Sequence, residues 1–136
     1  MQRIAQFGSD IFALMLLAAM LAWISSGLSR PLLVDEVSLQ TALSWGKSAL
    51  WLDARTKSDY QAEHIPGALS LHMDHWQEDI SAVQRQAVDK EKIVVYCYSA
   101  SCNSALLMAR RLYKEAGLQN VVVMHGGWES WQQERP

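Results

Sequence analysis

The sequence has little cysteine and no surplus of either charge. Two of its 136 residues are cysteines, which excludes a small scaffold held together by several disulfides. Lys and Arg number 12 against 14 Asp and Glu, so the chain lacks the basic surplus of a nucleic-acid-binding protein. Because half of the residues are hydrophobic and 19% are charged, a disordered or low-complexity chain is also excluded. The length suits about one domain.

The one long hydrophobic run lies near the N-terminus. Residues Ile11–Ile24 are all apolar, and no charged residue follows them before Arg30. A helix over residues 11–28 would be about 27 Å long, close to the hydrocarbon thickness of a bilayer. We therefore expect one membrane-spanning helix within an N-terminal segment of residues 1–30. A cleaved signal peptide and a buried core helix are the alternatives.

The charges that flank this run favour one orientation by a narrow margin. Arg3 and the α-amino group lie on one side of it, and Arg30 lies on the other. The small positive excess at the N-terminal side favours an N-terminus inside the cell. We therefore expect a single-pass membrane protein whose domain, residues 31–136, lies on the extracytoplasmic (periplasmic) side.

Residues 31–136 alternate between short apolar runs and longer mixed segments. Strands are predicted at residues 49–52, 68–71, 93–96 and 121–124, and helices at residues 37–45, 59–63, 76–88 and 104–116. This alternation predicts parallel strands joined by crossover helices, and therefore an α/β three-layer domain. In such a sheet the ligand site lies beyond the carboxyl ends of the strands.

One segment, which we call the cysteine loop, stands where that rule places the chemistry. It consists of Cys97, Tyr98, Ser99, Ala100, Ser101, Cys102, Asn103 and Ser104. Cys97 directly follows the clearest strand, and a helix is predicted from Ser104. The free N–H groups at a helix start carry partial positive charge, which favours the thiolate of a nearby cysteine. The pattern predicts a nucleophilic Cys97, with a buried, inert cysteine as the alternative.

Four short motifs follow one another along this region. They are Leu52-Asp53-Ala54-Arg55; Tyr60 followed by Glu63-His64-Ile65-Pro66-Gly67-Ala68; Val94-Val95-Tyr96-Cys97; and Gly126-Gly127 followed by Trp131 and Pro136. Together they resemble the signature of the rhodanese-like (sulfurtransferase) domain family over residues 34–136, with Glu63 where the family usually has glycine. The resemblance implies a five-stranded parallel sheet with helices on both faces.

The resemblance also implies transfer of a sulfane sulfur through a persulfide on Cys97. The thiolate would take the outer sulfur of thiosulfate or a persulfide, and a thiol acceptor, small molecule or protein, would then remove it. The amides of the cysteine loop would stabilise the charged sulfur. No cofactor and no nucleic-acid partner are expected. A metal site is not expected either, because the cysteines and histidines lack the spacing of zinc ligands.

Three side chains outside the cysteine loop are candidate supports for it. Asp53 and Arg55 end a predicted strand on the same side as Cys97, where they would brace the loop or form a structural ion pair. His64 precedes an Ile-Pro-Gly turn, which suits a hydrogen bond that stabilises the turn.

The cysteine loop departs from the family at Cys102. Many active members have an arginine at this position that helps to bind an anionic donor, whereas this loop has no Arg or Lys. The use of thiosulfate is therefore left open. Cys102 is also a candidate resolving thiol for Cys97 if their Cα atoms lie within about 7 Å. Two alternatives to sulfur transfer follow: a non-catalytic binding module at the membrane and a thiol-redox protein that uses both cysteines.

Overall fold

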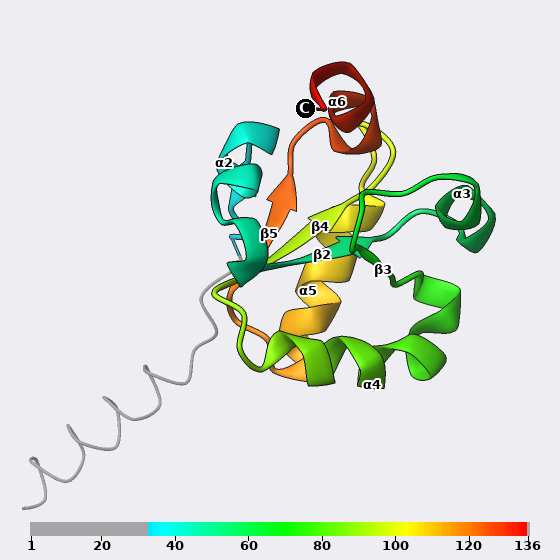
Figure 1. Cartoon of the computed structure of the whole chain (residues 1–136). Helices are drawn as coiled ribbons and strands as arrows, with labels where there is room; N and C mark the ends of the chain where they lie inside the picture. The colour runs from blue at the N-terminus through cyan, green and yellow to red at the C-terminus, as the bar shows by residue number, and fades with distance from the viewer. Residues whose placement is uncertain (1–32, 136) are drawn as a thin grey trace, which may run out of the picture. The chain divides into compact units, whose positions relative to one another are not determined.

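Short apolar runs form the strands of one sheet in the computed structural model, which describes residues 33–135 (Figure 1). The strands are β1 (Glu36–Val37), β2 (Ala49–Asp53), β3 (Leu69–Ser70), β4 (Lys92–Tyr96) and β5 (Val121–Met124). All neighbouring strands are parallel, in the order β1-β5-β4-β2-β3. The predicted five-stranded parallel sheet is therefore confirmed.

Helices cover both faces of this sheet. They are α2 (Leu39–Ser44), α3 (Lys57–Ala62), α4 (Trp76–Ala87), α5 (Ser104–Ala116) and α6 (Gly127–Glu134), with short 3-10 turns η1 (Gly46–Ser48) and η2 (Met73–His75). Helices α4 and α5 lie on one side of the sheet, and α2 and α6 lie on the other (Figure 1). The three layers follow from burying the apolar side of each helix against the sheet.

Alternate residues of the central strand β4 supply the two cores. Ile93 and Val95 pack in the core beneath α4 and α5, which contains Met108. Val94 and Tyr96 pack in the core beneath α2 and α6. Because successive side chains of a strand point to opposite faces, a strand covered on both sides must be apolar throughout. This explains why the β4 sequence shows no polar alternation.

Two elements differ from the sequence prediction. Val37, predicted within a helix, instead pairs with Met124 in the edge strand β1, and α2 begins after it. Ser38 sets this start, because its side chain accepts a hydrogen bond from the Thr41 N–H. Helix α6 was not predicted at all. The predicted helix at residues 104–116 and the predicted strand at residues 121–124 are confirmed.

The predicted membrane-spanning helix at residues 11–28, and with it the N-terminal segment 1–30, lies outside the described residues. Within residues 33–135, no helix is long and apolar enough to cross a membrane.

Candidate functional site

Cys97 lies at the carboxyl end of the central strand, where the sequence placed it. It directly follows β4, and the cysteine loop then leads into α5 at Ser104. The Cys97 residue is only 6% exposed, whereas Tyr98 beside it is 52% exposed. Cys97 is therefore nearly buried at the base of the loop, whereas the next side chain, that of Tyr98, faces outward.

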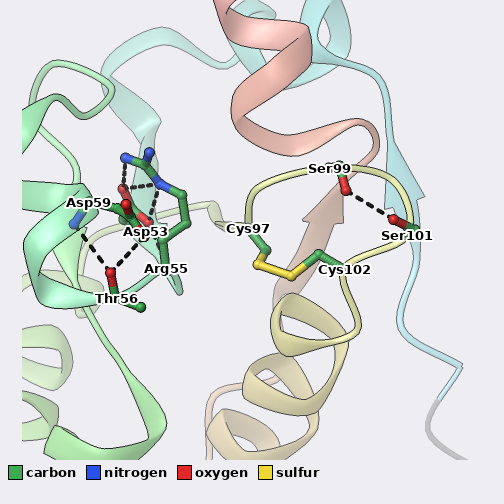
Figure 2. Close-up of a disulfide and its surroundings, with 8 residues drawn as sticks. All are labelled: Asp53, Arg55, Thr56, Asp59, Cys97, Ser99, Ser101 and Cys102. Atoms are coloured by element: carbon green, nitrogen blue, oxygen red, sulfur yellow. Dashed lines mark hydrogen bonds and ion pairs between the residues drawn. A yellow bond between two sulfur atoms is a disulfide. The ribbon is translucent and has the colours of Figure 1, made fainter.

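Cys97 and Cys102 are joined by a disulfide across the loop (Figure 2). Their Cα atoms lie 6.1 Å apart, within the range that a disulfide can bridge. The structure therefore describes the oxidised form of the loop. A sulfur in a disulfide is not a nucleophile, so Cys97 can act as one only after the bond is reduced.

The backbone of the loop offers donors for a negative charge. The Cys102 N–H donates to the Ser99 carbonyl at 3.1 Å, which closes the loop on itself. The N–H groups of residues 98–101 have no backbone acceptor within the part of the chain that the structure describes. Helix α5 begins at Ser104, the last residue of the loop, so its N-terminal partial charge adds to these donors. A charged sulfur or a bound anion can be stabilised here.

Helix α6, which lies on the opposite face of the sheet from α5, contacts the cysteine loop through two backbone hydrogen bonds. The Trp128 N–H donates to the Cys97 carbonyl at 2.8 Å, and the Glu129 N–H donates to the Tyr98 carbonyl at 3.0 Å. Gly127, at the start of α6, has a φ of +55°. A Cβ on Gly127 would overlap the Cys97 carbonyl group. The close approach of α6 to the cysteine loop therefore requires glycine at this position.

Asp53 and Arg55 form a buried ion pair at the end of β2. The Arg55 Nη2 lies 2.7 Å from the Asp53 Oδ2, and the Arg55 Nη2 also donates to the Glu63 carbonyl at 2.6 Å. The Asp53 carboxylate accepts a further hydrogen bond from the Tyr96 hydroxyl at 2.7 Å. The guanidinium stacks on the Trp128 ring at 4.3 Å from its centroid. The pair thus braces β2, β4 and α6 around the site.

The burial of this network changes the pKa values of two of its members. Burial lowers the pKa of the Arg55 guanidinium, but the hydrogen bond and the charge of Asp53 outweigh burial and raise it overall. Burial, followed by the hydrogen bond to Asp53, raises the pKa of the Tyr96 hydroxyl well above its usual value. Arg55 therefore stays charged and Tyr96 stays protonated in the folded protein.

His64 lies in the turn before β3 and contacts Tyr60. The His64 Nδ1 lies 2.8 Å from the Tyr60 carbonyl oxygen, and the two rings stack with centroids 3.9 Å apart. The Tyr60 hydroxyl in turn donates to the Ala68 carbonyl at 2.8 Å. These contacts are those of a residue that stabilises the turn, and His64 does not line the pocket at Cys97.

A pocket of about 180 Å³ opens at Cys97. It is lined by Ala54, Arg55, Thr56, Asp59, His72, Cys97, Tyr98 and Ser104. Of the predicted site residues, the structure thus brings together Arg55, Cys97, Tyr98 and Ser104. Asp53 does not line the pocket itself but pairs with Arg55, which does. Ser99 and Ser101 contact each other through their hydroxyls at 3.1 Å (Figure 2).

Four residues of the pocket were not predicted as site residues from the sequence: Ala54, Thr56, Asp59 and His72. Thr56 caps α3 by accepting from the Asp59 N–H, and its hydroxyl donates to the Asp59 carboxylate at 2.6 Å. A Thr followed three residues later by an acidic residue is a helix-start signal, and it could have located this pair. His72 carries no comparable signal. It reaches the pocket because β3 pairs with β2.

The lining provides little free positive charge. The Arg55 guanidinium is turned toward Asp53 rather than toward the disulfide (Figure 2). The His72 Nδ1 lies 3.3 Å from the Asp74 backbone nitrogen and 3.5 Å from the Asp74 carboxylate, so Asp74 already contacts this ring. Within residues 33–135 no group of three His, Cys, Asp or Glu side chains could hold a metal ion.

Comparison with solved structures shows the same fold. A protein from Bacillus halodurans is 24% identical, with a TM-score of 0.61 over 86% of this chain and 80% of that chain. A rhodanese-related protein from Thermoplasma volcanium is 23% identical, with a TM-score of 0.60 over 74% of this chain and 93% of that chain.

Comparison of sequences identifies the family as well as the fold. The thiosulfate sulfurtransferase GlpE of Coxiella burnetii is 35% identical over 85 residues, which cover 62% of this chain and 72% of the relative. The model of the family described as "Rhodanese-like domain" matches residues 37–134, which include β4, the cysteine loop and α6. The chain therefore belongs to the rhodanese-like domain family.

Proposed function

We propose that this protein is a sulfurtransferase that carries a sulfane sulfur on Cys97. The family and the GlpE relative, named a thiosulfate sulfurtransferase, support the enzyme class of a rhodanese-type sulfurtransferase. The observation that carries the residue assignment is the position of Cys97. It is the cysteine that lies at the end of β4, lines the pocket and precedes the loop amides and α5.

The reaction has two halves once the disulfide is reduced. The Cys97 thiolate attacks the outer sulfur of the donor, and the rest of the donor leaves; with thiosulfate this product is sulfite. The outer sulfur stays on Cys97 as a persulfide, whose negative charge the loop amides stabilise. A thiol acceptor then attacks that outer sulfur and leaves with it. Cys97 returns to the thiolate.

The charges of the pocket favour donors of low negative charge. Arg55 is neutralised by Asp53, and the carboxylate of Asp59 also lines the pocket. A doubly negative thiosulfate is attracted only by backbone amides and by the His72 ring. The reacting group of a persulfide donor, whether a small molecule or a protein, carries at most one negative charge and is less dependent on a cation. We therefore expect a persulfide to load Cys97 faster than thiosulfate does.

The sulfur adduct, seen in the intact mass, and the thiocyanate formed with cyanide test the proposal together. The full-length chain is reduced, freed of reductant and oxygen, and incubated with thiosulfate or with a small-molecule persulfide. In the presence of cyanide, the wild type should form thiocyanate, and Cys97→Ala should form none. If neither donor yields thiocyanate, a sulfur adduct or sulfide, the alternative of a binding module without turnover replaces sulfur transfer.

The disulfide favours a second candidate function, a thiol-redox protein that uses Cys97 and Cys102. Both sulfurs are already bonded in the structure, which is the oxidised half of such a cycle. This candidate predicts that the reduced chain reduces a disulfide substrate without gaining sulfur. Sulfur on Cys97 after incubation with a donor would distinguish the two functions.

We also propose that residues 11–28 anchor the chain as a single-pass protein, with the domain on the extracytoplasmic side. The support is the apolar run Ile11–Ile24 and the slight positive excess before it. The full-length chain should stay with membranes in alkaline carbonate and leave them in detergent. N-terminal sequencing of the mature chain separates a retained anchor from a cleaved signal peptide.

A further inference from the structure

The second cysteine of the loop has no role in the transfer proposed above, yet it is bonded to the sulfur that would carry out that transfer. The disulfide spans five residues of sequence and Cα atoms 6.1 Å apart. The bond shows that the Cys102 sulfur can reach the Cys97 sulfur within this fold. When the bond is reduced, the Cys102 thiol is therefore placed next to whatever Cys97 carries.

This placement gives Cys102 an advantage over any thiol from solution. Cys97 is only 6% exposed, so an external acceptor must enter a small pocket to reach it. Cys102 is held in the same loop, and a reaction between groups fixed in one molecule has an effective concentration far above that of a free thiol. Cys102 also lies two residues before the start of α5, where a thiolate is favoured.

We propose that Cys102 discharges the Cys97 persulfide within the same chain, so that the sulfur leaves as sulfide. This inference rests on the proposed formation of the persulfide. The Cys102 thiolate attacks the inner sulfur, the Sγ of Cys97. The bond between the two Sγ atoms forms, and the bond from Cys97 Sγ to the outer sulfur breaks. The anionic persulfide first takes a proton from water, and the outer sulfur departs as hydrosulfide with that proton and the electron pair of the broken bond.

The step balances without an outside oxidant. Counted from the two thiols, the cysteines lose two electrons, and the sulfane sulfur gains them. The product is the disulfide that the structure contains. A new cycle then requires a dithiol reductant, which reduces the disulfide and becomes a disulfide itself. The partner of this activity is therefore a dithiol protein or small molecule, whereas a sulfur acceptor is not needed.

A single-turnover experiment tests this proposal. The full-length chain is reduced with dithiothreitol, freed of reductant and oxygen, and mixed with thiosulfate or cysteine persulfide in the absence of an acceptor. The wild type should release one sulfide per chain and lose two hydrogens in intact mass. Cys102→Ser should instead keep one added sulfur and release sulfide at least about tenfold more slowly. Cys97→Ser, the matched variant of the other cysteine, should neither gain sulfur nor release sulfide.

The outcomes separate this proposal from the one on which it rests. If both the wild type and Cys102→Ser keep the added sulfur and release no sulfide, the discharge is overturned and sulfur transfer stands. If Cys102→Ser gains no sulfur and the wild type releases no sulfide, sulfur transfer itself is overturned, and the discharge with it. A wild type that loses two hydrogens equally with and without donor, and releases no sulfide when the donor is present, would show an oxidation unrelated to sulfur and would also overturn the discharge. With thiosulfate as donor and dithiothreitol present throughout, the wild type should produce sulfide faster than Cys102→Ser, in which dithiothreitol must itself enter the pocket and take the outer sulfur.

Discussion

The backbone N–H of Trp128 donates to the backbone carbonyl of Cys97 at 2.8 Å. This bond joins the first turn of α6 to the residue that would carry the sulfur. Because it is a backbone contact, it constrains the distance between the two chain segments and leaves no room for a side chain between them. Gly127 occupies that space.

Replacing Gly127 with alanine should therefore displace the cysteine loop. The new Cβ would overlap the Cys97 carbonyl, and the φ of +55° is itself unfavourable for alanine. We expect Gly127→Ala to lower the free energy of unfolding by more than about 2 kcal/mol, and to slow sulfur loading of Cys97. Chemical denaturation and intact mass after donor treatment measure these two effects.

Gly117 provides the matched control for this substitution. It ends α5 with a φ of +72°, and a Cβ there would meet nothing within 4 Å. Gly117→Ala should lower the free energy of unfolding by about 1–2 kcal/mol, because alanine disfavours a positive φ, and should leave sulfur loading unchanged. Equal effects of the two alanines on loading would show that the contact between α6 and the loop does not matter for reactivity.

Removing the carboxylate of Asp53 should leave Arg55 as a buried charge without its partner. Asp53 is fully buried and Arg55 is 5% exposed. We expect Asp53→Ala to lower the free energy of unfolding by about 3–5 kcal/mol. Urea denaturation measures the loss. Arg135→Ala breaks an exposed pair with Glu63 and is the control, with an expected loss of about 0–1 kcal/mol.

The hydroxyl of Tyr96 should make stability depend on alkaline pH. Its pKa is raised in the folded chain, first by burial and then by the hydrogen bond to Asp53, whereas tyrosines of the unfolded chain titrate near pH 10, at about their ordinary pKa. The folded state thus holds this proton more tightly. Its contribution to stability is complete below about pH 10 and is lost as the pH rises above that value.

Tyr96→Phe should remove that contribution. The variant also loses the bonds of the hydroxyl to Asp53 and from the Ile65 N–H, so we expect it to be less stable at neutral pH by about 1–3 kcal/mol. Its stability should then decline less steeply than that of the wild type above pH 10. Urea midpoints between neutral and alkaline pH measure both effects. An alkaline decline as steep as in the wild type would contradict the assignment to Tyr96, and Tyr113→Phe, at an exposed tyrosine, serves as control.

His72 should affect the use of thiosulfate more than the use of a persulfide. It lines the pocket, and an imidazole ring can donate a hydrogen bond to an anion. Loss of one such hydrogen bond, about 1 kcal/mol, corresponds to roughly a fivefold rise in the KM for thiosulfate in His72→Ala. His75, three residues further on and outside the pocket lining, is the control. If His72→Ala lost the same fraction of its activity with thiosulfate and with a persulfide, His72 would have a structural role instead.

The parts of the fold that local signals determine were predicted well from the sequence. Charged residues precede β4, and Gly117 ends α5 in a left-handed conformation, so the bounds of both elements could be predicted. The position of Cys97 followed from the rule for parallel sheets. The resemblance to the family then supplied the chemistry, which composition and spacing alone would not.

Features that depend on tertiary contacts could not be predicted in this way. Gly126-Gly127 indicates a turn, and α6 begins there because its first N–H groups find acceptors on the cysteine loop. Val37 becomes a strand residue because β5 pairs with it. His72 belongs to the pocket through the pairing of β3 with β2. The disulfide of Cys97 and Cys102 depends on the path of a loop, which spacing limits but does not determine.

The parallel course of the strands also determines which end of the domain faces a partner. Strand β1 runs in the same direction as β4 within the sheet, and Cys97 follows the last residue of β4. Strands β2 and β4 both finish at the end of the sheet where Cys97 lies. A donor protein or a dithiol reductant must therefore approach the domain from that end of the sheet to reach the pocket.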